Sequence, residues 1–325
     1  MRFLVQRIGF YVVTAWAAIT LNFLIPRLMP GNPAESVLSR FGGTVTPAQI
    51  AAVKAQFGIG GGSLIAQYGT YWKNLAQGNL GLSITYFPAK VTTVIGSALP
   101  WTIVLIGMST VIGFVIGTLL GVVAGWRRGG KLEWLLPVGM FFSAVPYFWI
   151  ALVALTVFGV DLHWFPLTGG FASNLTPGWS GPFIMSALSH STLPAVTIVL
   201  SSLAGWVVGM RNMMITTTSE DYVLVAHAKG LASRRVMLGY AARNAVLPNI
   251  AGFALSLGFI VSGGILVEQV FSYPGIGFEL FNAVGNSDYP LMQGIFLIIT
   301  LMVLLANLMA DFCYVILDPR IRQQG

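Results

Sequence analysis

Six long apolar segments constrain this chain more than any other feature of its sequence. They cover roughly residues 8–28, 98–125, 134–160, 191–211, 250–271 and 291–315. A helix needs about 20 apolar residues to cross the hydrocarbon core of a bilayer, and each segment reaches that length. Hydrophobic residues make up 56% of the chain and charged residues only 8%, against about 45–50% and about 25% in soluble domains. The sequence therefore predicts an all-α integral membrane protein with six transmembrane helices.

The apolar segments divide the chain into four predicted regions. Residues 1–29 form an N-terminal transmembrane helix, and residues 30–97 form a long loop inserted between the first two helices. Residues 98–315 form a core of five transmembrane helices that includes a polar loop at 212–249, and residues 316–325 form a tail.

Lysine and arginine are distributed unevenly between the two sides of the predicted helices. If the N-terminus is cytoplasmic, 12 of the 17 basic residues lie inside: Arg2, Arg7, Arg127, Arg128, Lys131, Arg211, Lys229, Arg234, Arg235, Arg243, Arg320 and Arg322. The outer loops 161–190 and 272–290 contain no lysine or arginine. Since short cytoplasmic loops are enriched in basic residues, both termini and the 212–249 loop are predicted to be cytoplasmic. The net charge of +7 then reflects topology, and no nucleic-acid partner is expected.

The long loop at 30–97 is extracytoplasmic in this topology and contains two predicted short helices. Thr46 and Pro47 favour the start of a helix that ends at Phe57. A second helix, from Leu64 to Gln77, carries an aromatic stripe on one face: Leu64, Tyr68, Tyr71, Trp72 and Leu75. We interpret it as a helix lying in the lipid headgroup zone, with a small soluble subdomain as the alternative. The outer loop 161–190 is also rich in aromatic residues and is predicted either to contact an external partner or to lie against the membrane.

Glycine and proline mark special positions inside the predicted spans. Glycines recur every four residues in the second span, at Gly113, Gly117, Gly121 and Gly125. This spacing predicts a helix face on which another helix packs closely, although a substrate path is the alternative. Pro146 is predicted to kink the third span, because proline lacks an amide hydrogen.

The polar stretch from Thr216 to Pro248 lies between two apolar segments, and we call it the elbow. Thr217 or Thr218 is predicted to cap a first helix, with Glu220 and Asp221 in its opening turn. Gly230 is predicted to end that helix. Ser233 begins a second helix that Pro248 ends, and its predicted apolar face consists of Met237, Leu238, Ala241 and Ala245. The pattern predicts a cytoplasmic helical elbow that a partner protein binds.

The sequence offers little support for catalysis or for a bound metal or cofactor. The run GIGGGS at 58–63 lacks the Lys-Ser/Thr ending of a phosphate-binding loop. No metalloprotease or hydrolase motif occurs, and the histidines His163, His190 and His227 are far apart in sequence. We therefore predict that the chain is not an enzyme, and that it binds no cofactor or metal itself.

An energy source must then come from outside the chain. Glu268 and Asp311 lie near the ends of their spans and not at the bilayer midplane, where an ion-coupled transporter binds its ions. An ATP-hydrolysing partner bound at the elbow is the favoured hypothesis. Two alternatives stay open: an ion-coupled secondary transporter that uses Glu268 or Asp311, and a membrane scaffold without a pore.

Ordered motifs along the whole chain resemble one known family. They are PGNPAE at 30–35, GNLGLS at 78–83, EDYVLVAHAKGL at 220–231, RNAVLPN at 243–249, VEQVFSYPGIG at 267–277, DYPLMQG at 288–294 and LDPRIR at 317–322. Together they resemble the B-type membrane subunits of bacterial ABC importers for oligopeptides, dipeptides and nickel. The elbow resembles the EAA loop of these permeases. Where the general EAA pattern has Glu-Ala-Ala, this chain has Leu224, Val225 and Ala226, a departure usual for peptide-type members.

The resemblance implies a type I ABC importer permease in the bacterial cytoplasmic membrane. It implies a C-type permease partner, ABC ATPase subunits that are one fused or two separate chains, and an extracytoplasmic peptide-binding protein. ATP and Mg would be bound by the ATPase subunits and not by this chain. The implied substrates are oligopeptides or dipeptides, with nickel or another small solute as the alternative. The implied ATPase-coupling residues are Asp221, Tyr222, Ala226, Lys229, Gly230, Leu231, Arg234, Arg243, Leu247 and Pro248.

Overall fold

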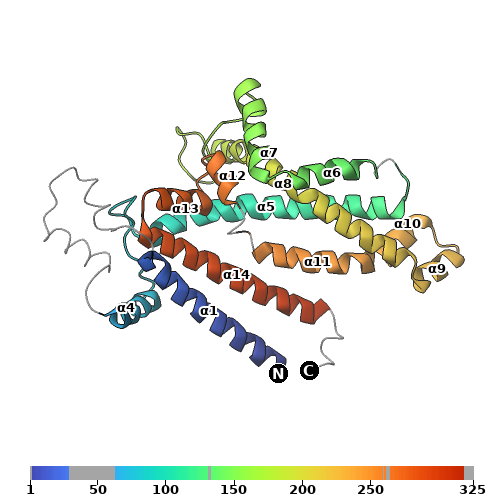
Figure 1. Cartoon of the computed structure of the whole chain (residues 1–325). Coiled ribbons are helices and arrows are strands. Elements are labelled where there is room, and N and C mark those ends of the chain that lie inside the picture. Colours follow the sequence, from blue (N-terminus) through green and yellow to red (C-terminus); the bar gives the residue numbers. More distant parts are fainter. Residues whose placement is uncertain (1, 29–62, 131–132, 259, 261–263, 318–325) are drawn as a thin grey trace. The chain divides into compact units, whose positions relative to one another are not determined.

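The computed structural model of the chain describes residues 2–28, 63–130, 133–258, 260 and 264–317, and helices dominate them (Figure 1). The chain divides into two compact units. Unit 1 contains Met1–Thr102 and Pro274–Leu304, and unit 2 contains Ile103–Tyr273 and Leu305–Gly325. The division falls inside two long helices, α5 (Val91–Trp126) and α14 (Tyr289–Leu317).

Four helices of the described residues are long and apolar enough to cross a membrane. They lie in α1 (Arg2–Leu28), α5, α8 (Gly181–Thr218) and α14. A fifth span results if α6 (Leu135–Ala144), α7 (Tyr147–Ala154) and the π-helix η1 (Leu155–Asp161) are taken together. The segment predicted at 250–271 overlaps the second half of α11 (Arg243–Gly258) and contains α12 (Ile265–Val270), and residues 259 and 261–263 between them lie outside the described ones. The all-helical membrane architecture is thus confirmed, with four or five candidate spans among the described residues.

The third predicted span is broken at Pro146, more sharply than the kink that we predicted. The helix axis turns by 98° between α6 and α7. Val145 has ψ 129°, an extended backbone, and Pro146 directly precedes the first residue of α7. Proline forces the preceding residue out of the helical region and provides no amide hydrogen to the turn before it. Helix α6 therefore ends here, and α7 begins in a new direction.

In unit 1, the predicted helix after Ser63 is present as α4 (Leu64–Ala76). The hydroxyl of Ser63 accepts a hydrogen bond from the amide of Ala66 at 3.3 Å. The rings of Tyr68 and Tyr71 pack against Phe23 of α1, and the hydroxyl of Tyr68 lies 2.7 Å from that of Thr20. Part of the aromatic stripe is therefore used to attach α4 to α1. The helix predicted at Pro47–Phe57 lies outside the described residues.

Two polar attachments also hold unit 1 together. Asn22 of α1 donates its side-chain amide to the carbonyl of Gln293 of α14 at 2.8 Å, and Gln293 donates to the carbonyl of Asn22 at 3.0 Å. Such amide pairs hold helices together where hydrophobic contact alone gives little preference. Asp288 is fully buried and accepts hydrogen bonds from the hydroxyl of Ser83 and from the amides of Thr85 and Leu291. Its carboxylate therefore has a structural role after α13 (Ile276–Gly285).

In unit 2, the glycine face of α5 packs against α8. A Cβ atom added at Gly117 would lie 2.5 Å from the Cβ of Trp206, and one at Gly121 would lie 2.6 Å from the Cβ of Met210. At Gly125 the added atom would lie 2.5 Å from the Cβ of Met214. Atoms this close overlap, so the glycines are what permits the two backbones to approach. The predicted helix–helix contact is confirmed.

Replacing Gly121 with alanine should therefore destabilise the protein. The new methyl group would also lie 2.7 Å from the backbone oxygen of Val207, which cannot move without displacing α8. We expect a loss of about 1–3 kcal/mol, as for other overpacked cores, measured as a lower midpoint of thermal unfolding in detergent. Gly205→Ala on α8 is the matched control, because nothing lies within 4 Å of its added Cβ. Equal midpoints for the two variants would contradict the packing argument.

Candidate functional site

The elbow consists of four short elements after the end of α8. They are α9 (Asp221–Ala228), α10 (Ser233–Val236), the π-helix η2 (Met237–Ala242) and the start of α11. The predicted cap at Thr217 or Thr218 is wrong, since both residues belong to α8 and Glu220 is the residue that precedes α9. The hydroxyl of Thr218 donates to the carbonyl of Ile215 at 2.9 Å, and that of Ser219 donates to Thr216 at 2.7 Å. These hydroxyls therefore bind the last carbonyls of α8 and do not cap α9.

The predicted end of the first elbow helix at Gly230 is confirmed. Gly230 has φ +73°, the left-handed conformation that glycine adopts without steric cost. Its amide donates to the carbonyl of His227 at 2.9 Å, and the amide of Leu231 donates to the carbonyl of Ala226 at 3.4 Å. These two bonds form a Schellman motif, which satisfies the free carbonyls at the end of α9.

The predicted end of the second helix at Pro248 is wrong. Helix α11 runs from Arg243 to Gly258 with Pro248 inside it, so the elbow continues directly into an apolar helix. Proline is tolerated within membrane helices, because neighbouring groups can satisfy the carbonyl that it leaves free. Leu247 and Pro248 are exposed on α11.

The π-helix η2 changes which residues of the second helix are buried. Val236 and Ala241 are fully buried, whereas Leu238, which we predicted on the buried face, is 48% exposed. A π-helix forms hydrogen bonds between residues five apart, so Val236 and Ala241 come onto one face. The prediction of Leu238 failed because it assumed the spacing of an α-helix.

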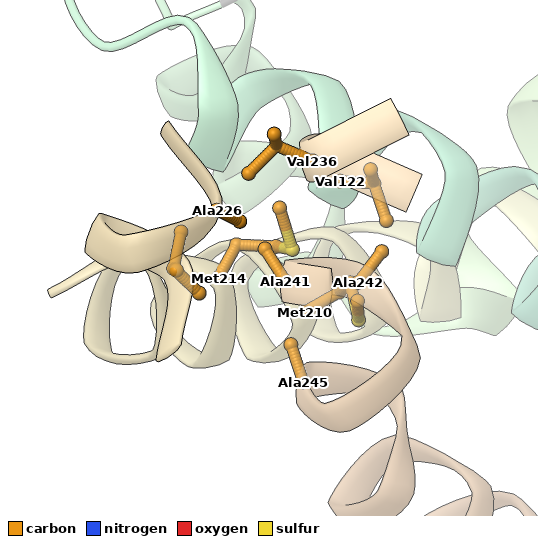
Figure 2. Packing of buried hydrophobic residues seen from close by; sticks show 9 residues of the cluster. Val122, Met210, Met214, Ala226, Val236, Ala241, Ala242 and Ala245 are labelled. Carbon is orange, nitrogen blue, oxygen red and sulfur yellow. The ribbon is translucent and has the colours of Figure 1, made fainter. Parts of the chain in front are cut away.

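A cluster of small and flexible apolar side chains fixes the elbow to α5 and α8, and Figure 2 shows it. We call it the elbow cluster, and its members are Val122, Met210, Met214, Val223, Ala226, Val236, Ala241, Ala242 and Ala245. Helix α9 contributes Val223 and Ala226, which are 0% and 2% exposed. The other apolar side chains of α9 point away from the cluster: Tyr222, Leu224 and Val225 are 38%, 55% and 51% exposed. Helix α9 therefore has one apolar face that is buried in the elbow cluster and a second apolar face that is exposed.

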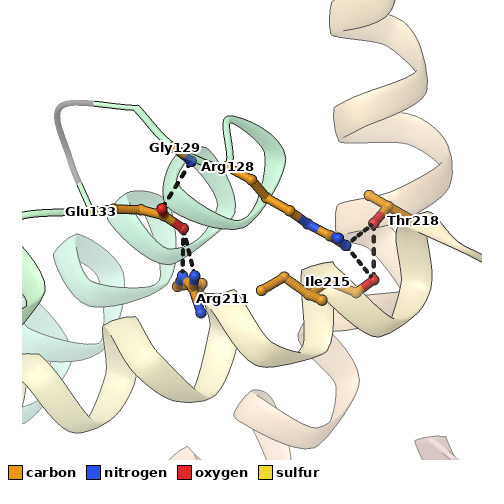
Figure 3. A network of polar contacts seen from close by, with 6 residues as sticks. All are labelled: Arg128, Gly129, Glu133, Arg211, Ile215 and Thr218. Carbon is orange, nitrogen blue, oxygen red and sulfur yellow. Dashed lines mark hydrogen bonds and ion pairs between the residues drawn. The ribbon is translucent and has the colours of Figure 1, made fainter.

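Polar contacts connect the residues between α5 and α6 to α8, and Figure 3 shows them. Glu133 accepts hydrogen bonds from the guanidinium of Arg211 and from the amide of Gly129. These contacts hold the pKa of the Glu133 carboxyl below its usual value, mainly through the hydrogen bonds from Arg211, so the carboxylate is charged at neutral pH. Arg128 donates to the carbonyl of Ile215 and to the hydroxyl of Thr218.

The predicted coupling residues fall into two groups. Asp221, Tyr222 and Lys229 are exposed on or directly after α9, where Ala226 is buried and Leu231 packs against the elbow cluster. Gly230 is exposed in the turn, and Arg234 is exposed on α10. The second group lies on a different helix: Arg243, Leu247 and Pro248 are exposed on α11.

Sequence reasoning missed the exposed pair Leu224 and Val225 and the buried anchor Val223. The three-residue spacing between Val223 and Ala226 is the signal that could have found them. It places both anchors on one helix face and the two residues between them on the other.

The fold and the elbow together define a multi-pass membrane protein with an exposed apolar face on α9. Residues 117–323 match the family described as the binding-protein-dependent transport system inner membrane component. The match covers more than half of the chain, and the chain belongs to this family.

Similar proteins over the full length of the chain are named as peptide permeases. The Di/tripeptide transport system permease protein DppB of Pseudomonas aeruginosa is 33% identical, and the alignment covers 100% of this chain and 99% of that protein. The Oligopeptide transport system permease protein AppB of Bacillus subtilis is 32% identical over 93% of both chains. The Oligopeptide transport system permease protein OppB of Haemophilus influenzae is 29% identical over 99% of both chains.

Family membership supports the prediction that the chain is a transport subunit of an ABC importer in the inner membrane. Such a permease has no ATPase site of its own. Membership also implies ATPase and substrate-binding partners. The alternatives of an ion-coupled transporter and of a scaffold do not agree with this membership. Glu268, one of the two acidic residues that the first alternative could use, is fully buried on α12.

The elbow cluster generates a direct test of how α9 is held. Replacing Ala226 with leucine should force α9 away from its seat, because the fully buried Val223 and Val236 leave no space for a larger side chain. We expect a cost of about 1–3 kcal/mol and faster proteolytic cleavage in the elbow. Ala228→Leu is the matched control, since Ala228 is exposed at the end of the same helix. Equal cleavage rates for the two variants would contradict the assignment of Ala226 as an anchor.

Proposed function

We propose that this chain is the pore subunit of an ATP-driven importer that takes up oligopeptides or dipeptides by alternating access. A partner ATPase binds the elbow and supplies the energy. The observation that carries this proposal is the second apolar face of α9, where Tyr222, Leu224 and Val225 are exposed although Val223 and Ala226 already fix the helix. Exposed apolar side chains gathered on one short helix are typical of a protein interface.

The proposed topology has six spans with both termini in the cytoplasm. It includes an extracytoplasmic insertion at 30–97, a core at 98–315 with the loop 212–249, and a tail at 316–325. The asymmetry of the basic residues between the loops supports this orientation. It places α9 on the cytoplasmic side, where ATP is available to the partner.

The proposed assembly contains a C-type permease as the second half of the pore. ABC ATPase subunits, one fused or two separate chains, bind ATP and Mg below it, and an extracytoplasmic peptide-binding protein delivers the substrate. The names of the three relatives favour peptides over nickel as the substrate. Lys229 and Arg234 are exposed beside α9 and suit an acidic surface on the ATPase.

The proposed coupling is a rigid-body displacement of α9. Its anchors belong to the elbow cluster, which also includes Met210 and Met214 of α8. A force on α9 is therefore passed to the end of α8 and not absorbed by a loose loop. ATP binding and the loaded binding protein must each favour one of the two pore states for this displacement to drive transport.

The contact with the ATPase is tested by replacing Leu224 with glutamate. A carboxylate on the exposed apolar face would have to be buried without a partner in the interface, which is costly. We expect the variant to fold and to lose the co-purifying ATPase. Leu238→Glu is the matched control, because Leu238 is similarly exposed on η2 but lies outside α9. Retention of the ATPase by the Leu224 variant would contradict the proposed interface.

The conformation of Gly230 gives a test of coupling itself. Gly230→Val places a β-branched residue at φ +73°, a strain of roughly 1–2 kcal/mol or more, although nothing lies within 4 Å of the added Cβ. We expect ATP hydrolysis to continue and peptide uptake into proteoliposomes to fall, with normal amounts of protein in the membrane. Gly230→Asn is the control, since asparagine tolerates this conformation better. Unchanged uptake in the valine variant would contradict the role of the turn.

The function as a whole is tested with the reconstituted complex. Uptake of a labelled peptide should require ATP and the binding protein, and it should persist when an ionophore removes ion gradients. Uptake that survives ATP depletion and stops with the ionophore would refute the proposed function. Competition by nickel but not by peptides would refute the proposed substrate.

A further inference from the structure

The short connection between α5 and α6 contacts the C-terminal part of α8 at two points. We call residues 127–134 the α5–α6 connection, and residues 131–132 in it lie outside the described residues. Its sequence holds one acidic residue, Glu133, together with Arg127, Arg128 and Lys131. The contacts of Glu133 and Arg128 go to different turns of α8, as Figure 3 shows.

At the first point, Glu133 uses both of its carboxylate oxygens. Oε1 accepts from Nε of Arg211 at 3.2 Å and also from Nη2 of Arg211, while Oε2 accepts from the amide of Gly129 at 2.8 Å. The side chains of Glu133 and Arg211 are each 25% exposed. The carboxylate therefore binds Gly129 in the connection and Arg211 of α8 at the same time.

At the second point, Arg128 binds the last turn of α8. Its Nη2 atom donates to the carbonyl of Ile215 at 3.0 Å and to the hydroxyl of Thr218 at 3.2 Å. Thr218 is the last residue of α8 and lies at the start of the elbow. Close by in sequence, the ring of Trp126 at the end of α5 stacks on His227 of α9, with centroids 5.7 Å apart and planes 17° apart.

The contacts of Glu133 lie directly before α6, the helix that ends at the sharp turn into α7. Glu133 lies two residues before the start of α6, and α6 packs along α8, with the added Cβ of Gly139 only 3.4 Å from the Cβ of Ala204. Helix α6 ends at the 98° turn into α7. The pair of Glu133 and Arg211 thus joins α8 to the residues directly before the helix that ends at this turn.

We propose that Glu133 and Arg211 form a positioning pair that makes α6 move together with α8, so that a displacement of α9 reaches the broken helix pair α6–α7. Arg128 supports the same attachment at the end of α8. The inference rests on the proposed function, because it concerns how the work of the ATPase reaches the pore. It assigns to the α5–α6 connection a task beyond joining two helices.

Charge sorting across the membrane does not explain this geometry. An arginine that only fixes topology needs no carboxylate partner, whereas Arg211 donates two hydrogen bonds to one oxygen of Glu133. Partly exposed ion pairs contribute little to stability, so removal of the pair is expected to leave the chain folded. We therefore expect the variants to be present in normal amounts but α6 to no longer move together with α8.

The test measures peptide molecules taken up per ATP hydrolysed by the full complex in proteoliposomes. Glu133→Gln and Arg211→Gln should each lower this ratio about fivefold or more, the usual size of coupling between sites, while ATP hydrolysis continues. The double variant should be no worse than either single one, because both remove the same contact. Arg127→Gln is the matched control, since Arg127 is exposed in the same connection. An unchanged ratio in Glu133→Gln, or losses that add in the double variant, would overturn the proposal.

Two further variants separate positioning from folding. Arg211→Lys keeps the positive charge and should retain part of the peptide uptake per ATP hydrolysed. The charge swap, Glu133→Arg with Arg211→Glu, should recover at least part of the uptake per ATP that either glutamine variant loses. If a glutamine variant fails to reach the membrane, the charge-swapped variant provides the test. A charge-swapped protein that reaches the membrane but recovers none of the peptide uptake per ATP hydrolysed would overturn the proposal. Failure of the proposed function is distinguishable, because the wild-type complex would then take up peptide without hydrolysing ATP.

Discussion

The close approach of α5 and α8 is the contact on which the elbow depends. Gly121 and Gly125 leave room for Met210 and Met214, whose Cβ atoms lie where side chains of α5 would otherwise be. The same two methionines are fully buried members of the elbow cluster. One side of α8 is thus in contact with the glycine face, and the end of α8 forms the base on which α9, α10 and η2 pack. A change in the helix spacing would move the whole elbow.

Small side chains make this arrangement compact. Ala226, Ala241, Ala242 and Ala245 face the methionines, so three short elements meet within one cluster without large side chains of their own. Methionine adapts its shape to such irregular surfaces more easily than branched residues do. As a consequence α9 needs only two anchors, Val223 and Ala226, and its remaining apolar side chains are available to another protein.

The sequence predicted those features that depend on one residue and its backbone. Gly230 ends α9 because a left-handed turn is required there, and the glycine spacing in α5 indicates a close helix contact whatever the partner helix is. The two prolines show the limit of such reasoning. Pro146 ends a helix and Pro248 does not, although both have the same chemistry. What differs is the surrounding structure, which no single-chain pattern describes.

Side-chain pairing over long distances was equally hidden from the sequence. In the sequence Arg211 is only a topology signal, because its partner Glu133 lies 78 residues away. The position of Leu238 cannot be predicted from an α-helical spacing, because the residues around it form the π-helix η2. The distinction has a physical consequence for coupling. The elbow cluster is apolar and holds α9 against α8 by packing, whereas the hydrogen-bonded pair of Glu133 and Arg211 joins the residues before α6 to α8 with a defined direction. Apolar packing therefore supplies the attachment, and the ion pair determines which turn of α8 the start of α6 follows.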